Sequence, residues 1–204
     1  MATTRRQPNI IITGTPGVGK TTHCELLAQA TGLKHMSINQ IAKERDCYDG
    51  YDEELKTSIV DEDKVSHHKC DVFQCFIYHN FNHIDSLTLH QLLDAIEDEV
   101  KIGGYIIDWH ACDLFPKSWI DLVVVIRCNS TLLYDRLKAR GYSEKKLDEN
   151  MDAEIMQVLL EEARESYDEE IVVELQSDTL EDVDSNVERI EMWVGNWKRD
   201  LGIE

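Results

Sequence analysis

The feature that most constrains this chain is a glycine-rich segment near its start. Residues 14–21 read Gly-Thr-Pro-Gly-Val-Gly-Lys-Thr and match the pattern G-x-x-x-x-G-K-[ST] at every defined position. The mostly β-branched residues 9–13 predict a strand before it, and residues 21–30 predict a helix after it. In this context backbone N–H groups and the positive end of the helix converge on phosphate oxygens. The segment therefore predicts a nucleotide site, with Lys20 reaching the β- and γ-phosphates and the Thr21 hydroxyl on Mg²⁺.

Further apolar runs alternate with helix-like stretches along the rest of the chain. Strands are expected at residues 105–108 and 122–126, whereas residues 171–175 fit either a last strand or the end of a helix. Helices are expected at residues 92–100, 131–140, 151–170 and 183–197. Such alternation is typical of an α/β fold, with a central parallel sheet that helices cover on both faces. We expect a single domain over residues 1–204.

Composition and charge exclude several classes of protein. The 204 residues hold 40 acidic and 21 basic side chains, a formal net charge of −19. So acidic a chain disfavours nonspecific binding to nucleic acid and suits a basic protein partner. The first eight residues lack an apolar core and no apolar run approaches a membrane span, so we expect neither a secretory signal nor a membrane segment. Six scattered cysteines fit reduced thiols in the cytosol or nucleus.

Two polar residues follow the expected strand at 105–108. Asp108 ends this strand, where a second acidic ligand of the metal belongs in phosphate-loop enzymes. An ordinary capping role for Asp108 is the alternative. His110 lies two residues further on, and a lone histidine is more often structural than catalytic.

Five segments together resemble one known family. They are residues 13–22 around the glycine-rich segment, 48–54 (Tyr-Asp-Gly-Tyr-Asp-Glu-Glu), 61–63 (Asp-Glu-Asp), 108–116 (Asp-Trp-His-Ala-Cys-Asp-Leu-Phe-Pro) and 140–147 (Arg-Gly-Tyr-Ser-Glu-Lys-Lys-Leu). This combination resembles the adenylate kinase isoenzyme 6 family, the coilin-interacting nuclear ATPases. The resemblance implies a P-loop nucleoside-monophosphate (NMP) kinase fold, with an NMP-binding segment at residues 37–60 and a short lid at 139–149.

The resemblance also implies a function. The expected reaction is Mg²⁺-dependent phosphoryl transfer from ATP to AMP, accompanied by ATPase activity. The family is nuclear, so we expect the nucleoplasm and also the cytoplasm, with a role in small ribosomal subunit maturation through a ribosomal protein partner. The alternative is an ATPase-driven assembly factor in which AMP phosphorylation is incidental. A monomer is expected.

Roles for individual residues follow from the same resemblance. The ATP phosphates would be held by Gly17, Gly19, Lys20, Thr21 and Thr22. Asp108 would organise Mg²⁺ together with Thr21, and His110 would support the chemistry. Arg140, at the edge of the lid, would stabilise charge on the transferring phosphoryl group, and Arg136 is a second candidate one helical turn earlier.

One departure from the family pattern bears on the AMP site. Lys43 stands where an arginine of the family faces AMP. A lysine offers a point charge in place of a bidentate fork, so the affinity for AMP depends on this position more than ATP binding does. Lys43 favours the assembly-factor interpretation slightly, whereas the intact lid motif favours the kinase.

Residues 65–91 have no counterpart in the family. They hold three charged residues among 27, whereas the other 177 residues hold 58, and removing them restores the family pattern in register. One explanation is a binding insertion, since long loops are often functional. Another is a retained in-frame intron, because Lys64-Val65-Ser66 can be encoded AAG-GTG-AGT, a splice-donor consensus, and Gln91 can be encoded CAG. If the block is translated, a protein that binds nucleotide but turns it over weakly is a further alternative.

A zinc site is the third explanation for the inserted block. Its candidate ligands are Cys70, Cys75, His79 and His83. Only three residues separate Cys75 from His79, which is too few for the usual arrangement of ligand pairs, so the spacing disfavours this site.

Overall fold

The computed structural model describes residues 5–44 and 86–203. Within these residues five strands form one parallel sheet in the order β2-β3-β1-β4-β5. The strands are β1 (Ile10–Thr13), β2 (Lys34–Ser37), β3 (Tyr105–Asp108), β4 (Leu122–Arg127) and β5 (Val172–Gln176). The expected α/β fold with a central parallel sheet is confirmed, and residues 171–175 belong mostly to a strand.

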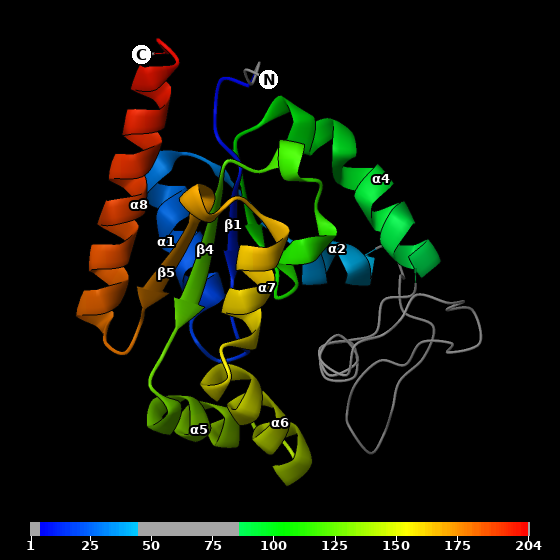
Figure 1. Cartoon of the computed structure of the whole chain (residues 1–204), viewed down its shortest axis with the longest axis vertical. Helices are drawn as coiled ribbons and strands as arrows, with labels where there is room; N and C mark the ends of the chain where they lie inside the picture. The colour runs from blue at the N-terminus through cyan, green and yellow to red at the C-terminus, as the bar shows by residue number, and fades with distance from the viewer. Residues whose placement is uncertain (1–4, 45–85, 204) are drawn as a thin grey trace.

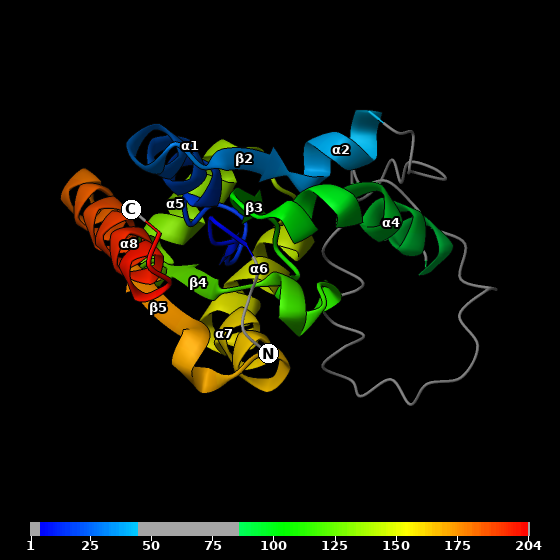
Figure 2. The same cartoon turned by 90° about the horizontal axis from the view of Figure 1, so that it is seen from above.

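Helices cover both faces of this sheet (Figures 1 and 2). Because side chains alternate along a strand, Ile10 and Ile12 of β1 enter one buried cluster and Ile11 enters the other. The first cluster includes residues of α1 (Lys20–Thr31) and α8 (Leu180–Asp200). The second includes residues of α4 (Ser86–Ile102) and α7 (Val158–Ser166). The strands β1 and β3 are buried along their whole length, as expected for strands with helices on both sides.

The order of the strands indicates at which end of the sheet a ligand would bind. The chain leaves β1 toward β2 on one side and returns from β3 to β4 on the other side of β1. Open parallel sheets bind ligands at such a point, outside the carboxyl ends of the strands. In Figure 1, α5 (Ser130–Ala139) and α6 (Glu144–Ile155) lie beyond the arrowheads of β4 and β5, at the end of the molecule opposite the C-terminus.

The sequence analysis missed β2 and the following helix α2 (Ile38–Glu44). β2 is an edge strand that exposes Lys34 and only half-buries His35, so its sequence lacks the continuous apolar run of the central strands. Of the expected NMP-binding segment, residues 37–44 are described. Residues 45–60 lie outside the described residues, as do residues 65–85 of the inserted block and its four candidate zinc ligands.

The helix expected at residues 151–170 is wrong in its extent. Two helices, α6 and α7, meet at Gln157, whose φ of 60° is left-handed and interrupts the helical path. No glycine or proline marks this break in the sequence. The helix expected at 92–100 is confirmed but begins at Ser86, so its first turns come from the end of the inserted block.

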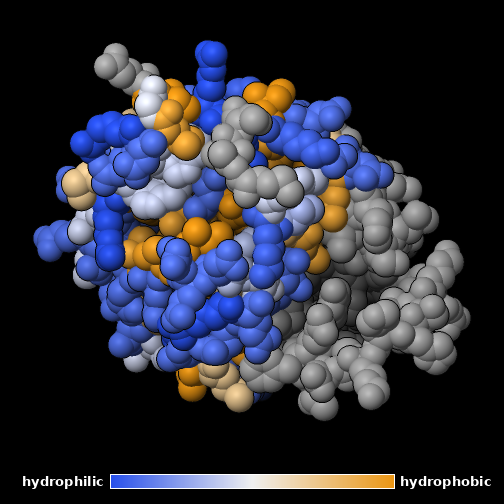
Figure 3. Space-filling view, turned by 45° about the horizontal axis from the view of Figure 1, so that its top comes forward, coloured by the Kyte–Doolittle hydropathy of each residue, from blue (hydrophilic) through white to orange (hydrophobic). Residues whose placement is uncertain are grey.

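The last helix is confirmed and also begins earlier than expected. Thr179 and Asp182 form a capping box, in which the Thr179 side chain accepts from the Asp182 N–H and the Asp182 carboxylate accepts from the Thr179 N–H. The apolar stripe of α8, including Val187, Ile190 and Val194, is buried in the core. Figure 3 shows a face covered mostly by hydrophilic residues, with one group of hydrophobic residues near the middle and smaller groups toward its edges. Among residues 5–44 and 86–203, no helix is both long and apolar enough to span a membrane.

Candidate active site

The glycine-rich segment forms a loop whose backbone requires glycine. Gly14, Gly17 and Gly19 have φ values of 140°, 98° and 106°, a region that residues with side chains rarely adopt. A Cβ atom at Gly14 would lie 2.3 Å from the carbonyl oxygen of Ile126, so the loop packs directly on β4. α1 begins at Lys20, immediately after the loop, which gives the helix N-terminus and loop of an anion site.

Lys20 is folded back over this loop. Its Nζ donates hydrogen bonds to the carbonyl oxygens of Gly14 (2.7 Å) and Thr15 (3.2 Å). Burial lowers the pKa of Lys20 to about 8, although the nearby carboxylate of Asp108 acts in the opposite direction. An anion held by the loop would stabilise the charged form of Lys20 and raise this pKa.

Asp108 is buried at the carboxyl end of β3. The register pairs it with Ile12 of β1, which places it beside the start of the glycine-rich loop. Its Oδ2 accepts a hydrogen bond from Thr21 Oγ1 (2.8 Å), and His35 Nε2 lies 3.4 Å from the same oxygen. Burial raises the pKa of this carboxyl, but the contacts with His35, Thr21 and Lys20 outweigh burial, so the net pKa lies below its ordinary value.

The side chains of Thr21 and Asp108 suit a magnesium ion. Mg²⁺ takes oxygen ligands and is usually held by one or two protein groups together with substrate phosphates and water. A hydroxyl and an ionised carboxylate 2.8 Å apart, next to a phosphate-binding loop, match that donor set. Asp108 makes this contact to a side chain of α1, which differs from an ordinary capping aspartate.

Both the backbone and the ring of His110 contact other residues. Its backbone oxygen accepts a hydrogen bond from Thr13 Oγ1 (2.7 Å), which ties the segment after β3 to the end of β1. Its ring lies with its centroid 4.1 Å from that of Trp109. The His110 side chain is buried and lines the cavity described next.

The predicted site residues converge on one cavity of about 270 Å³. Those that line it are Gly17, Gly19, Lys20, Thr21, Thr22, Asp108, His110 and Arg140. Arg136 does not line the cavity. Its guanidinium donates to the carbonyl oxygens of Gly17 (3.2 Å) and Asp178 (3.4 Å). Lys43 belongs to α2, and its side chain lies outside the described part of the chain.

Four further residues line the cavity although the sequence analysis gave them no individual role: Pro16 of the glycine-rich loop, Asn39, Tyr142 and Lys146. The Nζ of Lys146 lies 4.9 Å from the ring centroid of Tyr142, and burial lowers the pKa of this lysine. The segment at residues 139–149 therefore brings two basic side chains and an aromatic ring to the cavity. The resemblance implies a lid at residues 139–149 and an NMP-binding segment at residues 37–60, which includes Asn39, but it gives neither Asn39, Tyr142 nor Lys146 a role of its own.

A buried carboxylate joins the loop to α6. Glu154, near the end of α6, accepts a hydrogen bond from Thr15 Oγ1 (2.5 Å) and one from Arg127 Nε (2.6 Å). The Arg127 guanidinium also donates to the backbone oxygen of Glu154 (2.9 Å). Because Glu154 is only 2% exposed, water screens this contact weakly. The position of the loop is therefore coupled to the end of α6.

Comparison with known proteins places the chain in a family. A family model described as an AAA domain matches residues 10–157. The adenylate kinase isoenzyme 6 homologue of Schizosaccharomyces pombe is 46% identical over 196 residues, which cover 96% of this chain and 97% of that protein. The chain belongs to the adenylate kinase isoenzyme 6 family. The family homologue of Caenorhabditis elegans is 42% identical over 201 residues, covering 98% of this chain and 97% of the relative.

Solved structures agree on the fold of this adenylate kinase isoenzyme 6 family member. Shikimate kinase from Acinetobacter baumannii superposes with a TM-score of 0.55 at 13% identity, covering 95% of this chain and 96% of that chain. A gluconokinase from Sinorhizobium meliloti gives a TM-score of 0.51 at 13% identity, covering 96% and 98%. At such low identity the likeness concerns the fold alone, and the expected P-loop kinase fold is confirmed.

Proposed function

We propose that this adenylate kinase isoenzyme 6 family member transfers a phosphoryl group from ATP to AMP, giving two ADP, and also hydrolyses ATP. The supporting observation is the meeting, in one cavity, of the glycine-rich loop, the ionised Asp108 and the basic side chains Arg140 and Lys146. Phosphoryl transfer needs these groups because its catalysis consists mainly of positioning and of stabilising charge on the phosphate oxygens.

The loop and α1 bind ATP in this proposal. Backbone N–H groups at Gly17 and Gly19, with the side chain of Thr22, hold the phosphates, and Lys20 exchanges its two carbonyl acceptors for phosphate oxygens. Thr21 and Asp108 hold Mg²⁺, which when bound neutralises charge on the phosphates.

The lid and the segment after β3 complete the proposed site. Arg140 and Lys146 donate to the transferring phosphoryl group, and Arg136 supports the loop through its contact with the carbonyl oxygen of Gly17. His110 supports the chemistry from the buried wall of the cavity. Lys43 contributes a positive charge to the AMP site.

The deciding experiment measures ADP formed from Mg-ATP with and without AMP. We expect two ADP for each AMP consumed, and loss of this product in Lys20→Ala. Lys146→Ala should lower turnover by at least about tenfold, since a single lost donor to developing charge costs that much or more. The matched control is Lys145→Ala, because the Lys145 side chain is 67% exposed and lies outside the cavity lining. ADP formation at the same rate with and without AMP, and with no AMP consumed, would contradict the kinase.

An ATPase-driven factor in small ribosomal subunit maturation is the second candidate. The formal net charge of −19 favours it, because an acidic surface attracts a basic ribosomal protein and speeds their encounter. In this case the protein acts in the nucleoplasm and the cytoplasm, as a monomer that binds its partner directly. A basic small-subunit ribosomal protein would then accelerate phosphate release in the absence of AMP, and Lys20→Ala would abolish that acceleration.

A further inference from the structure

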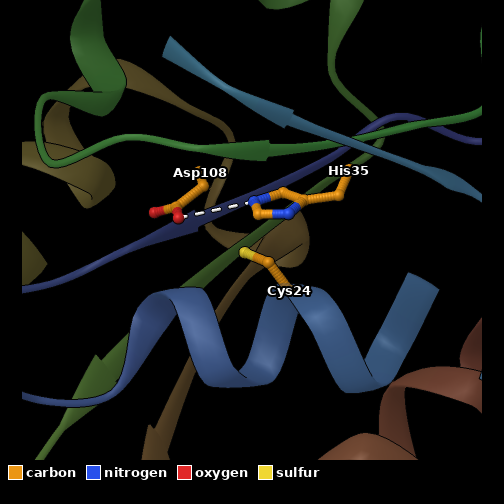
Figure 4. Close-up of side chains that lie close together, drawn as sticks. All are labelled: Cys24, His35 and Asp108. Atoms are coloured by element: carbon orange, nitrogen blue, oxygen red, sulfur yellow. Dashed lines mark ion pairs between the residues drawn. The ribbon is translucent and has the colours of Figure 1, made fainter. Parts of the chain in front are cut away.

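A second group of potential ligands lies beside the nucleotide cavity. Cys24 of α1, His35 of β2 and Asp108 of β3 each offer one ligand atom, and these atoms all lie within 4.8 Å of one another. Figure 4 shows the three side chains pointing toward one another from a helix and two neighbouring strands. The register of β2 on β3 pairs His35 with Ile106 and Ser37 with Asp108, so two separate strands bring the ring and the carboxylate together.

The spacing of these atoms fits tetrahedral coordination. Zinc–ligand bonds of about 2.0–2.3 Å place neighbouring ligand atoms about 3.3–3.6 Å apart. His35 Nε2 and Asp108 Oδ2 already meet that separation at 3.4 Å. The sulfur of Cys24 lies within 4.8 Å of the other two ligand atoms, so it needs a shift of about 1.3 Å at most.

His35 provides an independent sign that a ligand belongs between these side chains. Its Nε2 is buried, and its contact with Asp108 Oδ2, at 3.4 Å, is longer than an ordinary hydrogen bond. So long a contact compensates little for the burial of this nitrogen, and a bound cation would compensate for it better. Cys24 is fully buried against this nitrogen, so no bulk solvent intervenes on that side.

We propose that Cys24, His35 and Asp108 form a binding site for a thiophilic divalent cation such as Zn²⁺. The cation replaces the proton of the Cys24 thiol, which leaves to solvent, and accepts the lone pair of Nε2 from a neutral His35 ring whose proton is on Nδ1. Asp108 is the third ligand and a water molecule is the fourth. Thiolate and imidazole select zinc-like ions, whereas the oxygen pair of Thr21 and Asp108 suits Mg²⁺.

The two cations compete for one carboxylate. Asp108 Oδ2 accepts the Thr21 hydroxyl and also lies nearest His35, so an ion held by Cys24 and His35 withdraws Asp108 from Thr21. Zn²⁺ therefore inhibits ATP turnover. This consequence rests on the proposed function, whereas the binding of Zn²⁺ does not.

Binding is measured by titrating Zn²⁺ into the full chain against a chromogenic chelator. The background carries Cys70→Ala and Cys75→Ala, so that thiols of the inserted block make no contribution. In this background Cys24→Ala and His35→Gln should each remove one equivalent of Zn²⁺, or weaken its binding more than about 100-fold. The matched control is Cys128→Ala, because Cys128 is also a buried free cysteine but lies outside the cluster.

Two further readouts keep the outcome unambiguous. Co²⁺, used as a spectroscopic probe, should give thiolate charge-transfer absorption in the background and in Cys128→Ala but not in Cys24→Ala. Zn²⁺ should raise the melting temperature of the background protein and leave that of Cys24→Ala unchanged. Equal Zn²⁺ binding in Cys24→Ala and the background would overturn the proposal, as would a background that binds none. Zn²⁺ binding in a protein without ATP turnover would support the site and count against the proposed function alone.

Discussion

Thr15 in the glycine-rich loop donates a 2.5 Å hydrogen bond to Glu154, a residue 139 positions later in the chain. Glu154 is buried and also accepts from Arg127, so one carboxylate holds both the loop and the end of β4. Because Arg140 and Lys146, which line the cavity, come shortly before Glu154 in the chain, the glycine-rich loop and the segment at residues 139–149 share one anchor.

Removal of this anchor should destabilise the protein and slow turnover. Glu154→Ala leaves Arg127 and Thr15 without their buried acceptor, which should lower the free energy of unfolding by about 3–5 kcal/mol. Glu154→Gln keeps the shape and should cost less. Urea unfolding measures both, and Glu161→Gln is the control, because its exposed pair with Arg164 should contribute less than about 1 kcal/mol. Equal losses in the two glutamates would show that Glu154 anchors nothing.

Asp108→Asn should reduce ATP turnover far more than it reduces stability. The amide keeps a group of the same size beside Thr21 but removes the charge that a bound cation needs, so we expect a loss of at least about 100-fold in kcat. The pKa of Lys20 should fall further below about 8, since Asp108 now raises it. Steady-state kinetics at varied Mg²⁺ measure the first effect. Turnover near that of the wild type would show that ATP turnover does not need the carboxylate of Asp108.

Gly195→Ala should stabilise the protein. Gly195 lies inside α8 on its exposed side, and a Cβ atom there would meet nothing within 4 Å. Alanine loses less conformational entropy in a helix, so thermal unfolding should show a gain of about 0.5–1 kcal/mol. Gly17→Ala is the contrasting change, because its φ of 98° and Leu133 at 3.0 Å oppose a side chain. A destabilised Gly195→Ala would contradict this account of α8.

Glu162→Gln should stabilise the protein more as the pH rises. Burial, followed by the nearby carboxyl of Asp113, raises the pKa of Glu162 from 4.5 to about 9, so the folded state keeps a proton that the unfolded state has lost. The contribution of Glu162 is therefore fully present below about pH 4.5 and is lost as the pH rises toward about 9. Melting temperatures at about pH 6 and about pH 8 should show a larger advantage for Glu162→Gln at the higher pH. Glu165→Gln, on the exposed side of α7, should show a much smaller trend, because the charge of Glu165 is the least of the causes that raise the pKa of Glu162.

The glycine-rich loop and Asp108 were predictable because each depends on local order along the chain. The loop needs only a strand before it and a helix after it, and Asp108 needs only its place at the end of β3. The sheet then places these two segments side by side. A sequence pattern carries this information within about ten residues.

The residues that the sequence did not reveal depend on distant contacts. Glu154 belongs to a polar helix, and the sequence alone therefore predicts a solvent-exposed side chain. In the structure this side chain is buried and bound to Thr15. His35 and Asn39 belong to β2 and the start of α2, where an edge strand has no apolar run to mark it. The break at Gln157 carries no glycine or proline, so the residue types around it do not predict the left-handed turn.

The left-handed turn at Gln157 separates two helices, α6 and α7, that contribute to different parts of the molecule. A single straight helix over residues 144–166 would be about 35 Å long and could follow only one direction. With the turn, α6 lies beyond the ends of β4 and β5 and brings Lys146 to the cavity lining, whereas α7 lies along the sheet and buries Leu160 and Ala163. Because of this one backbone angle, α6 contributes a side chain to the cavity and α7, which follows it directly, contributes side chains to the hydrophobic core.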